Sequence, residues 1–135
     1  MAAFNKFNSF VEKLAEKVFN LQSDVLKVAL TNSAPSSAGS FLTDIAEIGY
    51  ANLSPRIVTV TASAQTGGLY KLVLADLVLT ASGTVGPFRY IVLYDDSTPS
   101  DDLIGWWDRG SSVTLENGDT FTLDFDGTNG VLQIQ

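Results

Sequence analysis

The stretch Ile104-Gly105-Trp106-Trp107-Asp108 (IGWWD) places the two tryptophans of the chain side by side. Successive side chains of a β-strand point to opposite faces of the sheet. If this stretch is a strand, its indole rings lie on opposite faces, and each face needs an apolar cover. One tryptophan then belongs to the core of the domain, and the other packs against a helix or a subunit interface.

Other segments of the chain are also apolar on both faces. They are residues 69–74 (LYKLVL), 88–94 (FRYIVLY) and 103–107 (LIGWW). An antiparallel sheet ordinarily packs one face on the core and leaves the other in water. This pattern predicts that the N-terminal segment and other protein chains cover the second face, because interfaces favour Trp, Tyr and Phe.

Turn signals divide most of the chain into short predicted strands. We expect strands at 25–30, 56–61, 69–74, 77–81, 88–94, 103–107, 113–115, 120–125 and 131–135, with one longer strand over 69–81 as an alternative. One short helical turn is expected within 41–48. Asn117-Gly118 is a strong hairpin signal and joins 113–115 to 120–125. The sequence predicts a mainly β fold, an antiparallel β-sandwich or a barrel-like, jelly-roll-like domain.

The N-terminal segment predicts an amphipathic helix over residues 4–21. Its apolar residues recur at steps of three and four and form one stripe: Phe4, Phe7, Phe10, Val11, Leu14, Val18 and Leu21. A helix that covers its own sheet is favoured, and a helix that docks onto a partner is the alternative. The chain is therefore expected to form a single domain, 1–135, with the helix at 4–21 and the β domain at 25–135.

The composition argues against several classes of function. Fifteen acidic residues against eight basic ones give a net charge of −7, so neither nucleic acid nor an anionic membrane is an expected partner. The chain has no Cys and no His, which excludes disulfides and removes the usual general base and the commonest metal ligand. We also expect no secretory leader and no membrane span. The sequence predicts a protein that is not an enzyme.

Four loops and one aromatic group are candidate sites. Residues 95–102 (DDSTPSDD) hold four carboxylates but lack the spacing of a calcium loop, so a solvated hairpin loop is expected. Residues 124–130 (DFDGTNG) are explained as a strand that ends in a turn. The glycines at 66–68 and 82–87 do not follow a phosphate-binding pattern. Trp106, Trp107 and Tyr94 are side chains of the kind that stack on sugar rings, although packing is the favoured role. No catalytic residue, metal or cofactor is expected.

Three long segments resemble a family of small proteins of tailed bacteriophages, whose members are encoded among virion structural genes. The segments are 2–35, 67–96 and 103–134, and the signatures are FNKFNSFVEKLAEKV (4–18), LKVALTN (26–32), GPFRYIVLY (86–94) and GWWD (105–108). The resemblance covers nearly the whole chain and implies a component of the phage particle. It brings no known functional residues.

The resemblance and the composition together predict a non-enzymatic virion structural protein, made in the bacterial cytoplasm. Small size, β content, acidity and absence of cysteine are typical of a capsid cement or decoration protein, which binds the major capsid protein as a homo-oligomer, with a trimer favoured. A tail, collar or head-tail adaptor component is the alternative, and a carbohydrate-binding receptor module is the third. The predicted interface residues are Phe4, Phe7, Phe10, Tyr94, Trp106 and Trp107.

Overall fold

The computed structural model describes residues 2–135, so Met1 of the predicted domain lies outside the described residues. The fold is mainly β, and its paired strands run antiparallel. In chain order the elements are β1 (Asn5–Lys6), α1 (Asn8–Ala15), β2 (Leu26–Thr31), the 3-10 turn η1 (Leu42–Asp44), β3 (Ile57–Val58), β4 (Val60–Thr66), β5 (Leu69–Leu74), β6 (Leu77–Thr80), β7 (Val85–Asp95), β8 (Leu103–Leu115), β9 (Thr120–Leu123) and β10 (Leu132–Ile134).

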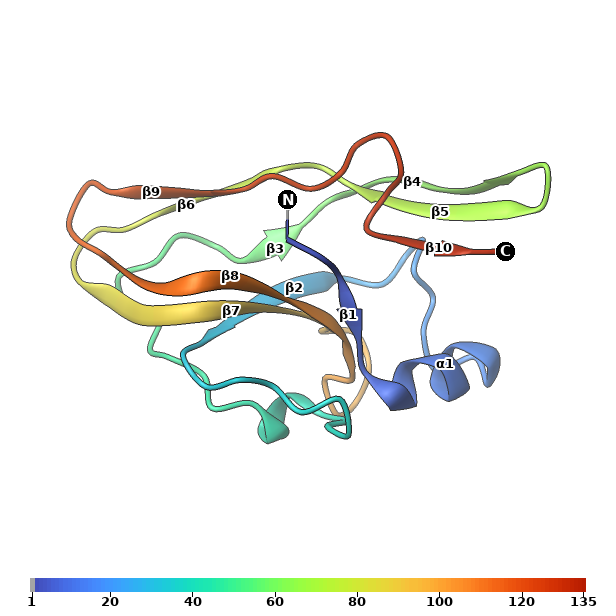
Figure 1. The fold of residues 1–135 in the computed structure, drawn as a ribbon, viewed down its shortest axis with the longest axis horizontal. Helices are drawn as coiled ribbons and strands as arrows, with labels where there is room; N and C mark the ends of the chain where they lie inside the picture. Colours follow the sequence, from blue (N-terminus) through green and yellow to red (C-terminus); the bar gives the residue numbers. More distant parts are fainter. Residues whose placement is uncertain (1) are drawn as a thin grey trace.

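The strands form two layers (Figure 1). The larger layer is a five-stranded sheet in the order β1-β8-β7-β2-β3. The other layer contains the three-stranded sheet β10-β5-β4 and the two-stranded sheet β6-β9, which lie at opposite ends of the molecule in Figure 1. Within residues 2–135 each sheet ends in free edge strands, so the barrel-like alternative is not confirmed.

The main apolar core lies between the two layers. Leu72 and Leu79 from the smaller sheets pack in one cluster with Phe88 and Ile104 from the large sheet, and all four side chains are fully buried. Trp107 belongs to this cluster, and its ring lies 5.2 Å from the ring of Phe4 between centroids. The period-2 alternation of β7 and β8 therefore directs one set of side chains inward, as the sequence predicts.

A smaller apolar cluster covers the outer face of the five-stranded sheet. Phe7, Ala29, Val92, Tyr94 and Leu103 are buried there, and Leu42, Ile45 and Trp106 pack against them. The cover comes from the N-terminal segment and from the loop that carries η1, which crosses below the sheet in Figure 1. The second face is thus covered by the same chain.

The predicted helix over residues 4–21 is much shorter in the structure. Asn5 and Lys6 form the edge strand β1, which pairs with Trp106 and Gly105 of β8, and α1 spans only Asn8–Ala15. The helix ends before Lys17, whose φ of 68° is left-handed. The three-residue spacing of Phe4, Phe7 and Phe10 suits a helix, but in the structure residues 5–6 pair with β8 and the adjoining Phe7 is fully buried.

The sequence predicts that the turn at Asn117-Gly118 pairs residues 113–115 with residues 120–125, and this pairing is wrong. The turn is present, with Gly118 at a φ of 90°, but β9 pairs with β6 of the opposite layer. The predicted strands 103–107 and 113–115 are one continuous strand, β8, which pairs along β7. The turn at residues 116–119 therefore carries the chain from one layer to the other. Residues 69–74 and 77–80 are two strands in different sheets, which resolves the alternative of one longer strand.

Candidate interaction surfaces

Four of the six predicted interface residues are buried inside this chain. The exposed fraction is 0% for Phe7, 4% for Phe10, 2% for Tyr94 and 5% for Trp107. These side chains contribute to the protein's own core and present no free surface to a partner. Phe4 and Trp106 are half-buried and remain partly accessible.

Trp106 and Phe7 form the centre of the outer cluster. Their ring centroids are 4.7 Å apart at an interplanar angle of 49°, an arrangement that favours aromatic pairs. The Phe7 backbone N–H donates a hydrogen bond of 3.1 Å to the Ile104 carbonyl, which holds the segment against β8. The second tryptophan of the GWWD signature is therefore directed inward, and the first packs against the N-terminal segment in cis.

The predicted sugar-stacking group does not form an exposed platform. Tyr94 and Trp107 are buried, and they belong to different clusters on opposite faces of the sheet. Only Trp106 is partly exposed, and Phe7 covers one face of its ring. Carbohydrate binding by stacking requires accessible ring faces, so these three residues do not support the carbohydrate-binding alternative.

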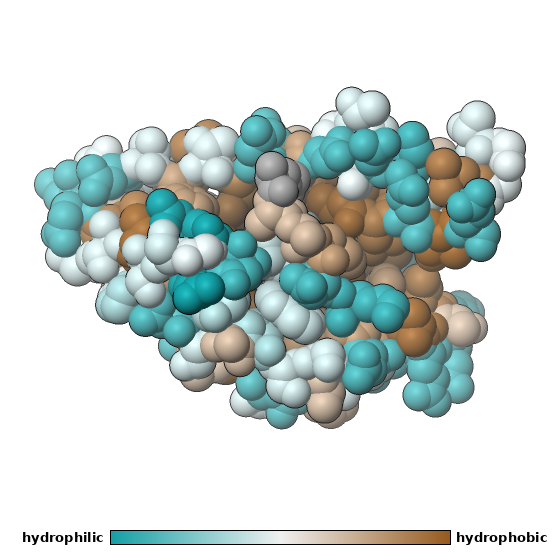
Figure 2. Space-filling model, viewed as in Figure 1, coloured by the Kyte–Doolittle hydropathy of each residue, from teal (hydrophilic) through white to brown (hydrophobic). Residues whose placement is uncertain are grey.

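An open apolar groove lies between α1 and β10. Its volume is about 990 Å³, and its walls include Phe10, Val11 and Leu14 from the N-terminal segment and Leu132 and Ile134 from β10. Figure 2 shows apolar atoms gathered in the hollow between these two elements. Val11 is 51% exposed and Ile134 is 44% exposed, and both side chains line this one groove. We call this feature the α1–β10 groove.

Free strand edges border the α1–β10 groove. β10 is the edge strand of its sheet, and β1 is the edge strand of the five-stranded sheet. An edge strand carries unpaired backbone N–H and C=O groups, which bind an added strand. Among residues 2–135, Lys6 is the only charged residue that lines the groove. Chain composition alone gave little sign of this surface, because it needs residues from both ends of the chain.

The acidic loop 95–102 is not a cluster of free carboxylates. Asp95 and Asp102 are buried, Lys13 pairs with Asp102, and Lys27 Nζ lies 3.2 Å from Asp96 Oδ2. In the described part of the chain, no group of three or more His, Cys, Asp or Glu side chains is arranged to hold a metal ion. The loop joins β7 to β8 as a hairpin, but it is not the solvated loop that the sequence predicts, because two of its four carboxyl groups are buried.

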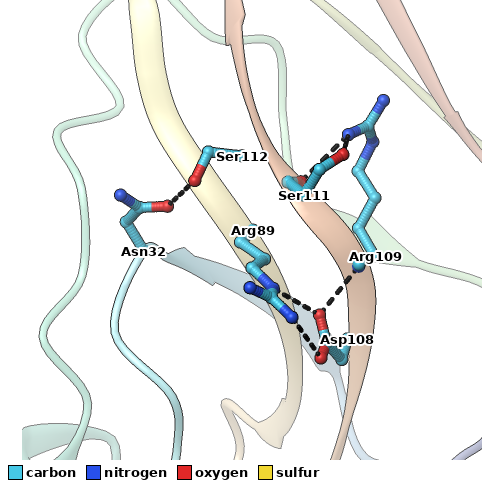
Figure 3. A network of polar contacts seen from close by, with 7 residues as sticks. Asn32, Arg89, Asp108, Arg109, Ser111 and Ser112 are labelled. Carbon is cyan, nitrogen blue, oxygen red and sulfur yellow. Dashed lines mark hydrogen bonds and ion pairs between the residues drawn. The ribbon is translucent and has the colours of Figure 1, made fainter.

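A polar network lies on strands β7 and β8 (Figure 3). Arg89 binds Asp108 through two parallel hydrogen bonds, Nε to Oδ1 at 2.8 Å and Nη2 to Oδ2 at 3.0 Å. This pairing lowers the pKa of Asp108, and the Gly110 backbone N–H contributes in the same direction. The Arg89 and Asp108 charges neutralise each other, so this ion pair links β7 to β8 and leaves neither side chain free as a base.

Searches against protein-family models, curated proteins and solved structures found no match for this chain. No helix in residues 2–135 is long and apolar enough to cross a membrane.

Proposed function

We propose that this chain is a non-enzymatic structural protein of the bacteriophage virion, and specifically a capsid cement or decoration protein. Its partners are the major capsid protein and further copies of itself, with a trimer favoured. The observation that carries the proposal is the resemblance of segments 2–35, 67–96 and 103–134 to small virion proteins of tailed phages. A two-layer, jelly-roll-like β-sandwich is compatible with that role.

The α1–β10 groove is the surface that we assign to the capsid contact. Stable assemblies bury apolar area and extend sheets across subunits. The groove offers both features, since exposed Val11 and Ile134 lie beside the free edge of β10. The low charge of its lining suits an apolar segment of the capsid protein, because burying an unpaired charge is costly.

The first experiment counts copies of this chain in purified virions by quantitative mass spectrometry, relative to the major capsid protein. A cement protein follows the capsid lattice, so we expect on the order of hundreds of copies per particle. A count of about six or twelve would place the chain in a ring at the collar, adaptor or tail and would favour that alternative. Absence from the particle would refute the virion role.

A matched pair of variants tests the groove. Val11 and Val78 are each 51% exposed, but Val11 lines the α1–β10 groove and Val78 lies on β6 at the other end of the molecule. Both Val11→Glu and Val78→Glu should leave the free energy of unfolding within about 0.5 kcal/mol of the wild type, since both positions are on the surface. We expect Val11→Glu to lose binding to capsids that lack the chain, and Val78→Glu to bind normally. Equal binding by the two variants would exclude the groove as the contact surface.

A further inference from the structure

Asp95 is a buried carboxyl group that lacks a complete set of partners. Its side chain lies at the end of β7, and the residue is 0% exposed. Oδ1 accepts a hydrogen bond of 2.8 Å from the Ser97 backbone N–H, whereas Oδ2 has no donor among the described residues. A buried carboxylate oxygen without a donor is costly, so this group needs a proton or another partner.

The side chain that faces Asp95 is another carboxyl group, that of Asp24. Asp24 lies in the connection between α1 and β2 and is half-buried, with its carboxyl group within hydrogen-bonding reach of Asp95. Asp24 Oδ2 accepts a hydrogen bond of 3.0 Å from the Asn20 backbone N–H, which holds the side chain in place. Two ionised carboxylates are both acceptors, so they form a hydrogen bond only when one of them carries a proton.

The two loops that carry this pair are joined by backbone contacts on either side of it. The Val25 backbone N–H donates to Ser97 Oγ at 2.8 Å, and the Asp96 backbone N–H donates to the Val25 carbonyl at 2.8 Å. Repulsion between two charged carboxylates at this point would separate the same loops. The protonation state of the pair is therefore coupled to the contact between residues 20–25 and 95–98.

The other charged groups of these elements are engaged elsewhere. Lys27 of β2 pairs with Asp96, and Lys13 of α1 pairs with Asp102. Asp101 adjoins Asp102 in the same loop. The carbonyl oxygen of Asp102 accepts a hydrogen bond from the Asp95 backbone N–H. The charge of Arg56 lies close to the hydroxyl group of Tyr94, the residue before Asp95. Lys13, Lys27 and Arg56 therefore do not neutralise the Asp24–Asp95 pair.

We propose that Asp24 and Asp95 share one proton, and that this proton fastens the α1–β2 connection to the β7–β8 loop. Loss of the proton leaves two negative charges in a partly buried site with no cation, and the contact between the loops weakens. The device is independent of the capsid role, because it lies in the body of the domain and none of its residues lines the α1–β10 groove.

Burial, followed by the Asp24 carboxyl group, raises the pKa of Asp95 to about 8. In the unfolded chain an Asp ionises near pH 4, so between about pH 4 and pH 8 the folded state holds one proton more than the unfolded state. Stability therefore falls as the pH rises through this window, by about tenfold in the folding equilibrium constant per pH unit. The pKa values of Asp44, Asp108 and Asp126 are lowered, so these groups affect the pH dependence of stability only below this window.

The test is chemical denaturation of the full chain at a series of pH values from 5 to 9. We expect the wild type to lose stability steadily toward pH 8, and Asp95→Asn to remove most of the slope, because Asn keeps the shape without the charge. Asp24→Asn should weaken the slope as well. Asp124→Asn is the control, since Asp124 is exposed and lies outside both loops. An unchanged slope in Asp95→Asn would overturn the proposal.

Carbon-13 NMR titration of the wild-type carboxyl groups tests the proposal without any variant. The Asp95 carboxyl signal and the amide signals of Val25 and Asp96 should change together with a midpoint near pH 8. An Asp95 midpoint near pH 4 would refute the shared proton. The denaturation series repeated with millimolar calcium gives the remaining outcome: stabilisation at pH 8 that Asp95→Asn abolishes would assign the pair to a cation and overturn proton sharing.

Discussion

Replacing Phe7 by Ala tests whether this chain covers the outer face of its own sheet. Phe7 is fully buried, its ring packs on Trp106 at 4.7 Å, and it joins β1 to α1. The substitution removes a whole aromatic ring from a closed cluster and leaves a cavity. Buried Phe→Ala changes cost about 3–5 kcal/mol. For a domain of 135 residues that corresponds to a fall of about 10–18 °C in Tm.

The assay is thermal and urea denaturation at several protein concentrations, with Phe41→Ala as the matched control. Phe41 is 39% exposed and its ring packs under Lys13, so its loss should cost about 1 kcal/mol or less. A cluster formed within one chain loses the same free energy at every protein concentration, so the difference between the wild-type and Phe7→Ala midpoints should not depend on concentration. Equal effects of Phe7→Ala and Phe41→Ala, or a Phe7→Ala effect that changes with concentration, would refute cover by the same chain.

Two further perturbations test how the edge strand and the polar network are held. Gly105→Ala should lower the free energy of unfolding by about 1–3 kcal/mol, because a Cβ there would lie 2.2 Å from the Phe4 ring. Gly127→Ala is the control and should be near neutral, since a Cβ there meets no atom within 4 Å. Urea denaturation of both variants measures the difference. The Arg89 pairing lowers the pKa of Asp108, so its contribution is present above about pH 4 and is lost as the pH falls below it. The stability of Asp108→Asn should therefore fall less steeply than that of the wild type as the pH is lowered below about 4. An acid titration followed by circular dichroism measures this, and a curve that matches the wild type would contradict the reasoning.

Local patterns in the sequence located most of the strands. Alternation of apolar and polar residues placed β2, and the turn at Gly67-Gly68 marked the start of β5. The last strand, β10, follows a turn that ends at Gly130. These features depend on neighbours within a few residues, so the chain alone carries them.

The N-terminal segment shows where local pattern fails. A spacing of three between phenylalanines suits a helix, and nothing local to residues 4–10 indicates a strand. The deciding residue is Gly105, about a hundred positions away in the chain. Its missing side chain leaves room for the Phe4 ring and lets β1 pair with β8. A contact at such separation is a tertiary property, and it outweighs helix propensity here.

The candidate surface was predicted only in part. The sequence indicated that aromatic residues must cover both faces of the sheet, and this is what the outer and inner clusters show. The predicted cover by the N-terminal segment is present through Phe7, but the loop around η1 supplies the rest of the cover that the sequence assigned to other protein chains. This cover buries most of the residues expected at an interface. The α1–β10 groove was missed, because its walls come from opposite ends of the chain.

The sequence by itself determined much of the strand content, the acidic composition without Cys or His, and the opposite directions of Trp106 and Trp107. Those properties follow from composition and from a period of two along a strand. Only the tertiary structure decided which strands are neighbours, as when β9 leaves β8 to pair with β6. It also decided that Asp95 meets Asp24, since burial and like-charge proximity arise only when distant segments pack together.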